Sequence, residues 1–553
     1  FTKFAQMKRA IYIFLLTVVC IFTLFLGNRV KPVDIMESRN LATAREMVVY
    51  GNYLNPTLNG EPRLEKPPLP TWGAAAVESL FRGSIAWQRS LTGVMGSLWV
   101  IFTFLIAIEL VSKQRQAFWI GLIMATCYGV MFMSRNATWD IWCHSMMSIA
   151  IFCYIKGIKS RSSAMVLFAT AGCFMGLSFL SKGLISFYTL LLPFLITYHI
   201  VYRPSMRGKW VSACIMIIVA LVVGGWWYMY LNISSGDAIS SVIQKETTDW
   251  ANHNTGPWYY YYLFFTESGI WCLYWLASLI YSFAHGWYKK EKLLVISALW
   301  TIIALILLSI PPEKKTRYLL PMMMPCALSV GSWFYVLYMQ LKSNFTRIEG
   351  IAVFKIISTA LSVIITAAGI ALLFKPMGIS ISFGTVMLSL ISIATGLFGI
   401  YVIFIKSNGR SLKFSCVKIR ILMLIFVVEL CSITLFGMGS ISKMVINSDM
   451  NRISDLREIC RLNDYNTYYP VTEELRPEIM YAAGKRIMPL DFDSADVANI
   501  ERPYILILSK PVEEYPLLER FKVTKLQRYD ANWWKKDSDN YNDNLVKDIY
   551  FIE

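Results

Sequence analysis

The chain has 553 residues, of which 56% are hydrophobic and 16% are charged, and its mean hydropathy is +0.48. That is more apolar surface than a soluble globular protein carries, which excludes that class and indicates that much of the chain faces lipid. The formal net charge of +17 does not indicate a nucleic-acid partner, because the basic residues stand in short groups between apolar runs rather than on one face.

The apolar runs predict an α-helical polytopic membrane protein. Runs long enough to cross a bilayer recur from Ile11 to about Gly439, and they predict about thirteen spans, the first of them an uncleaved helix. Groups of basic residues such as Lys8 and Arg9 fall on alternate connecting loops, which the positive-inside rule places in the cytoplasm. A cytoplasmic N-terminus and an odd number of spans place the C-terminal segment outside.

The first outer loop, from Asn28 to about Arg89, contains two helical patterns that are too short to span and are expected to lie along the membrane surface. Asp34 and Glu37 stand three residues apart at the start of the first, so one helical turn places both carboxylates on one side. N-terminal capping explains either acid alone equally well. Arg39 comes next in this helix, and it either contacts a phosphate or is an ordinary charge exposed to solvent.

Glu65 and Lys66 come later in the same loop, directly before a Pro-Pro pair that fixes the local backbone. They are either an ordinary solvated pair or an acid and a base held in place for function.

Asp140 lies at the outer mouth of the fourth predicted span, surrounded by Trp139, Ile141 and Trp142. A carboxylate in that position is not explained by solubility, so it is a functional candidate. The structural alternative is an ion pair with Arg135.

Basic residues also occur on the outer side, against the positive-inside trend. Lys182 occupies a tight turn between the fifth and sixth spans, while Lys314, Lys315 and Arg317 cluster at the mouth of the tenth. Such residues need an anionic partner, and a phosphate carried by a lipid would serve. Snorkelling of a long basic side chain at a helix end explains any one of these four residues, but it explains all four together less readily.

The second long outer loop ends in an aromatic run in which Tyr259 and Tyr260 are expected at the membrane interface. His253 in this loop is the one histidine placed to bind a metal outside the membrane, with Glu65 as a carboxylate partner. No motif in the chain requires a cofactor, since it has no Walker loop, no dinucleotide fingerprint and no C-x-x-C. The sequence leaves open whether the protein also binds a divalent metal, Zn or Mg.

The last part of the chain is acidic and has strand patterns at YILIL and DIYFI and a helical pattern at RISDLREICRL. These predict a small extracytoplasmic α/β domain. The expected organisation is a transmembrane domain over residues 1–445, with surface helices within 34–88, followed by a periplasmic domain over 446–553.

Several segments resemble the bacterial lipid A aminoarabinose transferase and protein O-mannosyltransferase group of membrane glycosyltransferases. They are RNLATAREMVVYGNYLNPTLNGEPRLEKPPLPTW, RNATWD, LSKG, HNTGPWYYYY and KKTRYLLP. Their order and spacing carry the resemblance, which covers most of the membrane region and implies the C-type glycosyltransferase fold.

The resemblance implies that an acid of the first outer loop is catalytic, usually within an Asp-Glu pair before an Arg. Met36 stands here where that Asp is expected. Glu37 is therefore the favoured acid by alignment, and Asp34 is its rival.

The resemblance also implies roles for other residues. Lys66 and Lys182 match lysines that contact the donor phosphate, and Asp140 matches an acid of the fourth span. Metal binding would fall on Glu65 and His253, and that metal need not take part in turnover.

The implied function is inverting transfer of a hexose or pentose from a polyprenyl-phosphate-linked donor, on the periplasmic side of the bacterial inner membrane. The acceptor is a lipid A-type glycolipid or a protein Ser/Thr, and protein O-glycosylation specifically is the close alternative. A secondary transporter of a lipid or small solute is the alternative from another class, although the charges gather at the outer rim rather than at the midplane. The chain is expected to be a monomer whose partners are the donor, the acceptor and membrane lipid. The candidate residues are Glu37, Asp34 and Asp140 for catalysis; Lys66, Arg39, Lys182, Lys314, Lys315 and Arg317 for the donor phosphate; Tyr318, Tyr259 and Tyr260 for lipid; and Glu65 and His253 for metal.

Overall fold

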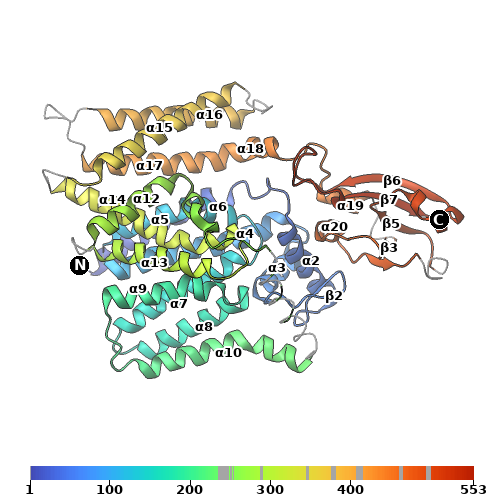
Figure 1. The fold of residues 1–553 in the computed structure, drawn as a ribbon, viewed down its shortest axis with the longest axis horizontal. Coiled ribbons are helices and arrows are strands. Elements are labelled where there is room, and N and C mark those ends of the chain that lie inside the picture. Colours follow the sequence, from blue (N-terminus) through green and yellow to red (C-terminus); the bar gives the residue numbers. More distant parts are fainter. Residues whose placement is uncertain are drawn as a thin grey trace. The chain divides into compact units, whose positions relative to one another are not determined.

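A computed structural model describes residues 2–111, 113–234, 254–286, 291–343, 348–374, 382–405, 415–459, 465–492 and 500–553, with residues 244, 248 and 252. The described chain is mostly helical and ends in a small sheet (Figure 1). It divides into two compact units. The membrane unit comprises Phe1–Asn28, Glu65–Pro70 and Arg89–Met438, and the loop–tail unit comprises Arg29–Leu64, Thr71–Gln88 and Gly439–Glu553.

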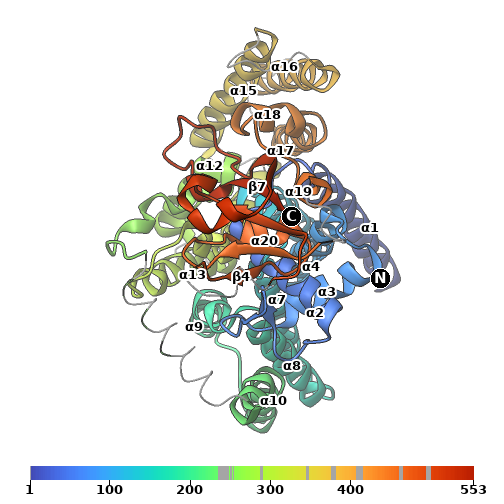
Figure 2. The ribbon, with the colours of Figure 1, turned by 90° about the vertical axis from the view of Figure 1, so that its right-hand side faces the viewer.

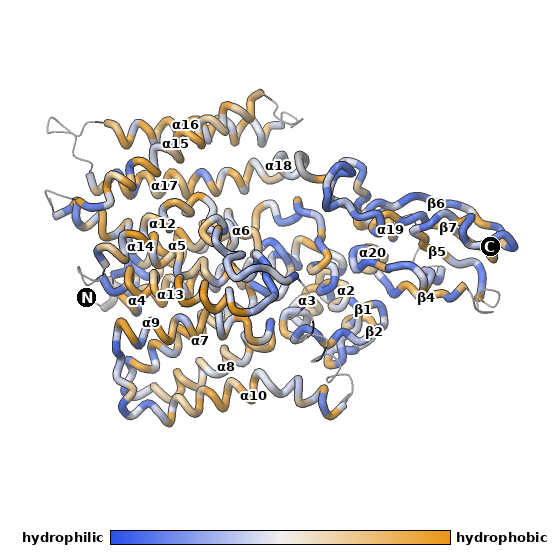
Figure 3. Tube along the Cα trace, in the orientation of Figure 1, coloured by the Kyte–Doolittle hydropathy of each residue, from blue (hydrophilic) through white to orange (hydrophobic). Residues whose placement is uncertain are grey.

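Ten helical stretches of the described residues are long and apolar enough to cross a membrane, which confirms a multi-pass membrane protein. Figure 3 shows apolar residues along most of their length. They are α1 with η1 (Gln6–Phe25), α4 (Ile85–Val111), α7 (Asp140–Lys159), α8 (Ala164–Lys182), α10 (Trp210–Ser234), α13 (Lys292–Ser309), η5 (Thr316–Met322) with α14 (Met323–Lys342), α15 (Ile351–Leu373), α16 (Phe383–Phe404), and α17 (Cys416–Ser432) with η7 (Ile433–Gly437) and the start of α18 (Met438–Val445).

Other apolar runs counted as spans from the sequence are shorter or interrupted. Cys127 is extended and separates α5 (Gln114–Thr126) from α6 (Tyr128–Met133). The run made of η2 (Phe187–Leu191) and α9 (Leu192–Tyr202) has only 16 residues. Gly269 has a positive φ of 66° within η3 (Tyr260–Trp271), just before α12 (Cys272–Tyr281) and η4 (Ser282–Gly286). These breaks explain why about thirteen apolar runs give ten full-length spans.

Close helix packing in the membrane unit relies on small residues. A Cβ on Gly172 of α8 would lie 2.2 Å from the backbone oxygen of Met216 on α10. In lipid no hydrophobic driving force brings helices together, because the surrounding acyl chains are as apolar as the side chains. Helix association therefore depends on close packing of this kind. Glycine at this position therefore permits the α8–α10 contact.

In the loop–tail unit, the first of the two short helical patterns is α2 (Ile35–Tyr50), and Gly51 adopts the left-handed conformation at its end. The antiparallel pair β1 (Thr57–Leu58) and β2 (Glu61–Pro62) follows. The helix α3 (Leu69–Leu80) contributes its residues from Thr71 onward to this unit.

The remainder of the unit is a mixed five-stranded sheet in the order β4-β3-β5-β7-β6. The strands β3 (Thr467–Pro470), β4 (Met488–Leu490) and β5 (Tyr504–Leu508) are parallel, and β7 (Val546–Ile552) is antiparallel to β5 and β6 (Val523–Asp530). The two predicted strands are β5 and β7, and the predicted helix begins as α19 (Ile453–Ile459).

Both faces of this sheet are covered, which agrees with a β5 that is buried at every position. Ile505 and Ile507 pack with Ile479 of α20 (Pro477–Ala483) and with Leu456 of α19, and Figure 2 shows α20 near the sheet. The opposite face packs against the short turn η9 (Pro516–Arg520), and the turns η8 (Val512–Glu514) and η10 (Asp543–Leu545) complete the unit. The predicted small α/β fold of this segment is confirmed.

Candidate functional site

Asp140 and Lys182 form an ion pair at one end of the membrane unit. Asp140 is the first residue of α7 and is 1% exposed, and Lys182 is the last residue of α8. The Nζ of Lys182 donates to Oδ1 of Asp140. Each charge also complements its helix dipole, since an acid is favoured at a helix N-terminus and a base at a C-terminus.

Arg135 does not pair with this carboxylate. Its guanidinium donates instead to the backbone oxygens of Leu26 at 2.9 Å and Met131 at 2.7 Å. The ion pair between Asp140 and Arg135 is therefore not formed, and the partner of Asp140 is Lys182.

Asp140 and His144, one helical turn apart, have polar atoms with no hydrogen bond. In the described part of the chain, Oδ2 of Asp140 and both ring nitrogens of His144 are buried without a partner. The His144 ring lies with its centroid 5.4 Å from that of Trp99. Buried polar atoms are normally satisfied, so these positions are available to a water or a ligand.

A cavity of about 70 Å³ opens beside the ion pair. Two lysines, Lys66 and Lys182, line it together with Glu313 and Tyr318. The remaining lining residues are Leu184, Ile185, Tyr188, Leu308 and Pro311. Two ammonium groups against an apolar wall suit a phosphate that is attached to a hydrocarbon chain.

Tyr318 is surrounded by charged groups. Its hydroxyl donates to Oε2 of Glu313 at 2.6 Å, and its ring centroid lies 5.5 Å from the Nζ of Lys182 and 5.9 Å from that of Lys315. The ammonium of Lys315 also pairs with Glu313. These contacts hold the aromatic ring in place at the cavity.

Glu313 has a lowered pKa. Burial alone would raise it, but the hydrogen bonds from Lys315 and Tyr318 and the positive charges of Lys315 and Arg317 outweigh burial. The carboxylate is therefore ionised at neutral pH and offsets part of the positive charge around the cavity.

Lys314 is directed elsewhere. Its buried ammonium donates to the backbone oxygens of Leu308, Ser309 and Pro311, at 3.3, 2.7 and 2.5 Å. Leu308 and Ser309 are the last two residues of α13, where the carbonyls lack helical partners, so Lys314 caps the helix. It is not among the residues that line the cavity.

Arg317 lies next to Tyr318, with its guanidinium carbon 6.0 Å from the ring centroid. Its Nε is buried and, in the described part of the chain, has no hydrogen-bond partner. Arg317 does not line the cavity itself.

The second outer loop reaches this region through its backbone. The amide of Lys314 donates to the carbonyl of Asn254 at 2.9 Å, and that of Gly256 donates to Pro312 at 3.2 Å. Tyr259 and Tyr260 are 57% and 40% exposed, and their position at the membrane interface stays a prediction.

The predicted metal ligands are only partly described. Glu65 is half-buried in the membrane unit, and His253 lies outside the described residues. The described residues contain no group of three or more His, Cys, Asp or Glu side chains that could hold a metal ion.

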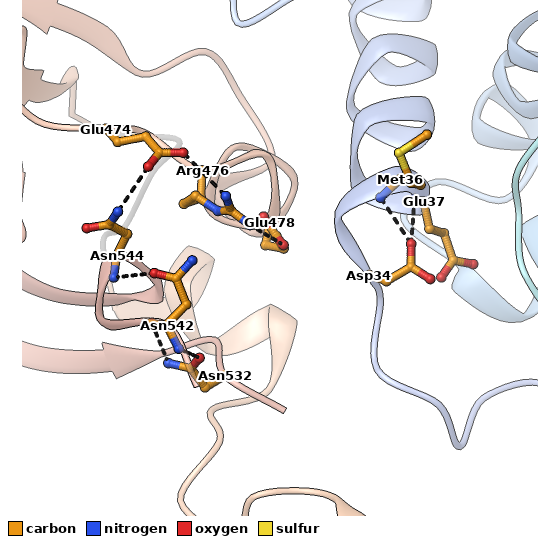
Figure 4. Close-up of polar contacts among 9 residues, drawn as sticks. All are labelled: Asp34, Met36, Glu37, Glu474, Arg476, Glu478, Asn532, Asn542 and Asn544. Atoms are coloured by element: carbon orange, nitrogen blue, oxygen red, sulfur yellow. Dashed lines mark hydrogen bonds and ion pairs between the residues drawn. The ribbon is translucent and has the colours of Figure 1, made fainter. Parts of the chain in front are cut away.

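Asp34 and Glu37 belong to the loop–tail unit and differ in their surroundings. Oδ1 of Asp34 accepts from the backbone amides of Met36 and Glu37, both at 3.0 Å (Figure 4). Oδ2 of Asp34 lies 2.6 Å from the Nζ of Lys31. Asp34 is thus the N-cap of α2. Glu37 is fully buried in the first turn, and half-buried Arg39 follows it.

Comparison with known proteins gives a family model described as dolichyl-phosphate-mannose-protein mannosyltransferase, which matches residues 65–228. An undecaprenyl phosphate-alpha-4-amino-4-deoxy-L-arabinose arabinosyl transferase 2 of Pseudomonas fluorescens is 24% identical over 304 residues, covering 53% of this chain and 54% of the relative. The corresponding transferase of Shewanella sediminis is 24% identical over 349 residues, covering 61% of each chain. The chain spans about half the length of the first of these relatives.

The solved structures extend the comparison to the fold. ArnT from Cupriavidus metallidurans bound to undecaprenyl phosphate has a TM-score of 0.64 at 16% identity, covering 98% of this chain and 97% of that one. The archaeal oligosaccharyltransferase AglB from Archaeoglobus fulgidus has a TM-score of 0.52 at 10% identity, covering 91% and 70%. The chain is thus similar in sequence to the aminoarabinose transferases and, over residues 65–228, to the protein mannosyltransferase family. The predicted C-type glycosyltransferase fold is confirmed.

Four predicted site residues lie within the segment that the family model matches, namely Glu65, Lys66, Asp140 and Lys182. Sequence reasoning did not single out Glu313 and Tyr188, which also line the cavity. Glu313 carried a signal, because it directly precedes the two lysines of PPEKK. Tyr188 stands in an apolar run and carried none.

Proposed function

We propose that this chain is an inverting glycosyltransferase that takes a sugar from a polyprenyl-phosphate-linked donor. The observation that carries the proposal is the cavity lined by Lys66 and Lys182, the second held by buried Asp140, against an apolar wall. The relatives named as transferases that use undecaprenyl phosphate support the same class of donor. They also favour transfer over the secondary transporter.

In this proposal the two lysines hold the donor phosphate. The acceptor oxygen forms a bond to the anomeric carbon of the sugar while the bond from that carbon to the phosphate oxygen breaks, and polyprenyl phosphate leaves. Negative charge grows on the phosphate as this happens, and the fixed ammonium groups stabilise it. Arg317 and Lys315, which approach Tyr318 beside the cavity, add positive potential.

We assign the catalytic role of the first outer loop to Glu37 rather than to Asp34. Asp34 already uses its carboxylate to cap α2 and to pair with Lys31. A hydroxyl acceptor requires Glu37 to take its proton as a general base. A phosphate acceptor is already anionic, so Glu37 would then only position it.

The proposed topology has the N-terminus in the cytoplasm of a bacterial cell and the chemistry on the periplasmic face of the inner membrane. The surface helices within 34–88 and the α/β segment over 446–553 are then periplasmic, and we propose that the latter selects the acceptor. The chain is proposed to act as a monomer. A divalent metal at Glu65 and His253 is a separate proposal that the transfer step does not require, and of these two residues the structure describes Glu65.

The acceptor is proposed to be a lipid A-type glycolipid, with a protein Ser/Thr as the second candidate. The resemblance to the lipid A aminoarabinose transferases favours the glycolipid, and the protein mannosyltransferase description of the family model favours the protein. Mass spectrometry of lipid A and of periplasmic glycoproteins, with and without this gene, tests both. A sugar lost from either acceptor supports the proposal and identifies the acceptor, whereas unchanged spectra for both contradict it.

A further inference from the structure

The loop–tail unit contains a second cavity, of about 420 Å³, that the proposed transfer does not use. Residues of α2, α3, α19 and α20 line it. Basic side chains predominate over the two acids, Glu46 and Glu78. The basic residues are Arg45, Arg82, Arg457, Lys485 and Arg486.

Arg45 lines the cavity and, among the described residues, has one guanidinium nitrogen without a hydrogen bond. The residue is only 7% exposed, its Nε lies 3.3 Å from Oε1 of Glu78, and its Nη1 donates to the carbonyl of Tyr481 at 2.9 Å. In the described chain its Nη2 is buried with no partner. A buried guanidinium donor without an acceptor costs free energy that a bound oxyanion would recover.

Arg457 places a second guanidinium beside the first. Its Nη2 donates to the same Tyr481 carbonyl at 3.1 Å, and its Nε donates to the carbonyl of Ala482 at 2.9 Å. Burial and then the positive charge of Arg45 lower the pKa of Arg457. Glu78 is the acid beside both, and its other oxygen accepts from the amide of Gly83 at 3.0 Å. This pair of arginines is therefore incompletely neutralised.

The other acid, Glu46, is already occupied. It pairs with Arg486 at 2.9 Å and accepts from the hydroxyl of Thr57 at 2.6 Å and the amide of Asn59 at 2.5 Å. Arg486 lies 3.7 Å from the ring centroid of Tyr50, which is 49% exposed. This side of the cavity thus combines a fixed charge with an accessible aromatic ring.

We propose that this cavity binds a phosphorylated sugar, with the phosphate on Arg45, Arg457 and exposed Arg82 and the sugar beside Tyr50. A phosphate group carries about −1.5 to −2 charges and three acceptor oxygens, which match several guanidinium donors. The volume leaves room for a sugar ring beyond the phosphate. A glycolipid headgroup and a soluble sugar phosphate share this chemistry.

The test measures binding by the full-length protein in lipid nanodiscs, without any transfer. Glucose 1-phosphate is titrated by calorimetry, with glucose as the uncharged control. Lipid A and its dephosphorylated form, each incorporated in phosphatidylcholine nanodiscs, are compared by native mass spectrometry. Selective binding of either phosphorylated ligand supports the proposal and identifies the source of the phosphate.

Variants locate the binding. Arg82 is exposed, so Arg82→Gln leaves the fold intact and is expected to weaken binding about ten-fold, the loss of one charge-assisted contact. Arg45→Gln is expected to weaken it further. Arg520→Gln, an exposed arginine of the same unit outside the cavity, is the matched control and is expected to change nothing.

The proposal is overturned if the phosphorylated ligands bind no better than their uncharged counterparts. It is also overturned if Arg82→Gln and Arg520→Gln bind equally well. Because binding is read without turnover, such a failure leaves the proposed transfer standing, and failure of transfer leaves this site standing.

Discussion

Asp140 and Lys182 are neighbours in the structure because α7 and α8 pack against each other, with the start of the first beside the end of the second. The two residues are 42 positions apart in the sequence. Each is charged in a mostly apolar environment, where a single charge is costly and a pair is tolerated. The pair therefore fixes one cavity lysine while leaving one oxygen of Asp140 without a partner.

Removing one member of this pair is expected to be more damaging than removing both. Asp140→Asn leaves Lys182 charged and unpaired, which costs about 3–5 kcal/mol of stability. Adding Lys182→Met removes that charge and is expected to restore most of the melting temperature. Transfer in membranes is expected to stay abolished in both variants, because both disturb the proposed phosphate site. Recovery of transfer in the double variant would show that the pair is purely structural.

The two acids of the first outer loop are expected to behave differently. Asp34→Asn keeps a side-chain oxygen for the amides of Met36 and Glu37, so it should retain transfer, and Asp34→Ala should lose about 1 kcal/mol of stability with the cap. Glu37→Gln, which is similar in size, should abolish transfer to a hydroxyl acceptor while the protein stays folded. Thermal unfolding and transfer are measured on all three. Normal transfer by Glu37→Gln together with loss in Asp34→Asn would reverse the assignment.

The sequence predicted the membrane class, two of the five strands of the sheet, and three residues of the cavity, Lys66, Lys182 and Tyr318, because apolar periodicity and misplaced charges are local signals. The sequence did not predict which charged side chains form ion pairs with one another. Arg135, which is close in sequence, is the partner that the structural alternative gave to Asp140, whereas the actual partner, Lys182, depends on helix packing. The contact of Arg45 with Tyr481 spans 436 positions and has no local signal.

Gly183 is expected to be required for the position of Lys182. Its φ of 72° and ψ of −141° belong to a region that only glycine adopts readily, although no atom lies within 4 Å of an added Cβ. Gly183→Ala should cost about 1–3 kcal/mol of stability and weaken donor binding. Gly225→Ala is the matched control, because its Cβ also meets open space and its backbone is helical. Equal melting temperatures for the two variants would contradict this reasoning.

Glu313 predicts a pH dependence. Its pKa in the folded protein lies below the ordinary value of 4.5, so its ionised form stabilises the fold. That contribution is fully present above pH 4.5 and is lost as the pH falls through the lower folded-state pKa. The melting temperature of Glu313→Gln should therefore lie below that of the parent at pH 7, and the difference should shrink in acid. A difference in melting temperature that grows as the pH falls would contradict a stabilising role for the ionised carboxylate of Glu313.

The central claim is that the cavity lined by Lys66 and Lys182 holds the phosphate of a polyprenyl donor. The most direct test is the affinity of the purified protein for undecaprenyl phosphate, measured by native mass spectrometry for the parent, Lys66→Met and Lys342→Met. Lys342 is exposed and does not line the cavity, so it serves as the control. We expect Lys66→Met to bind about ten-fold more weakly and the control to bind as the parent does. Equal affinity in all three proteins would contradict the claim.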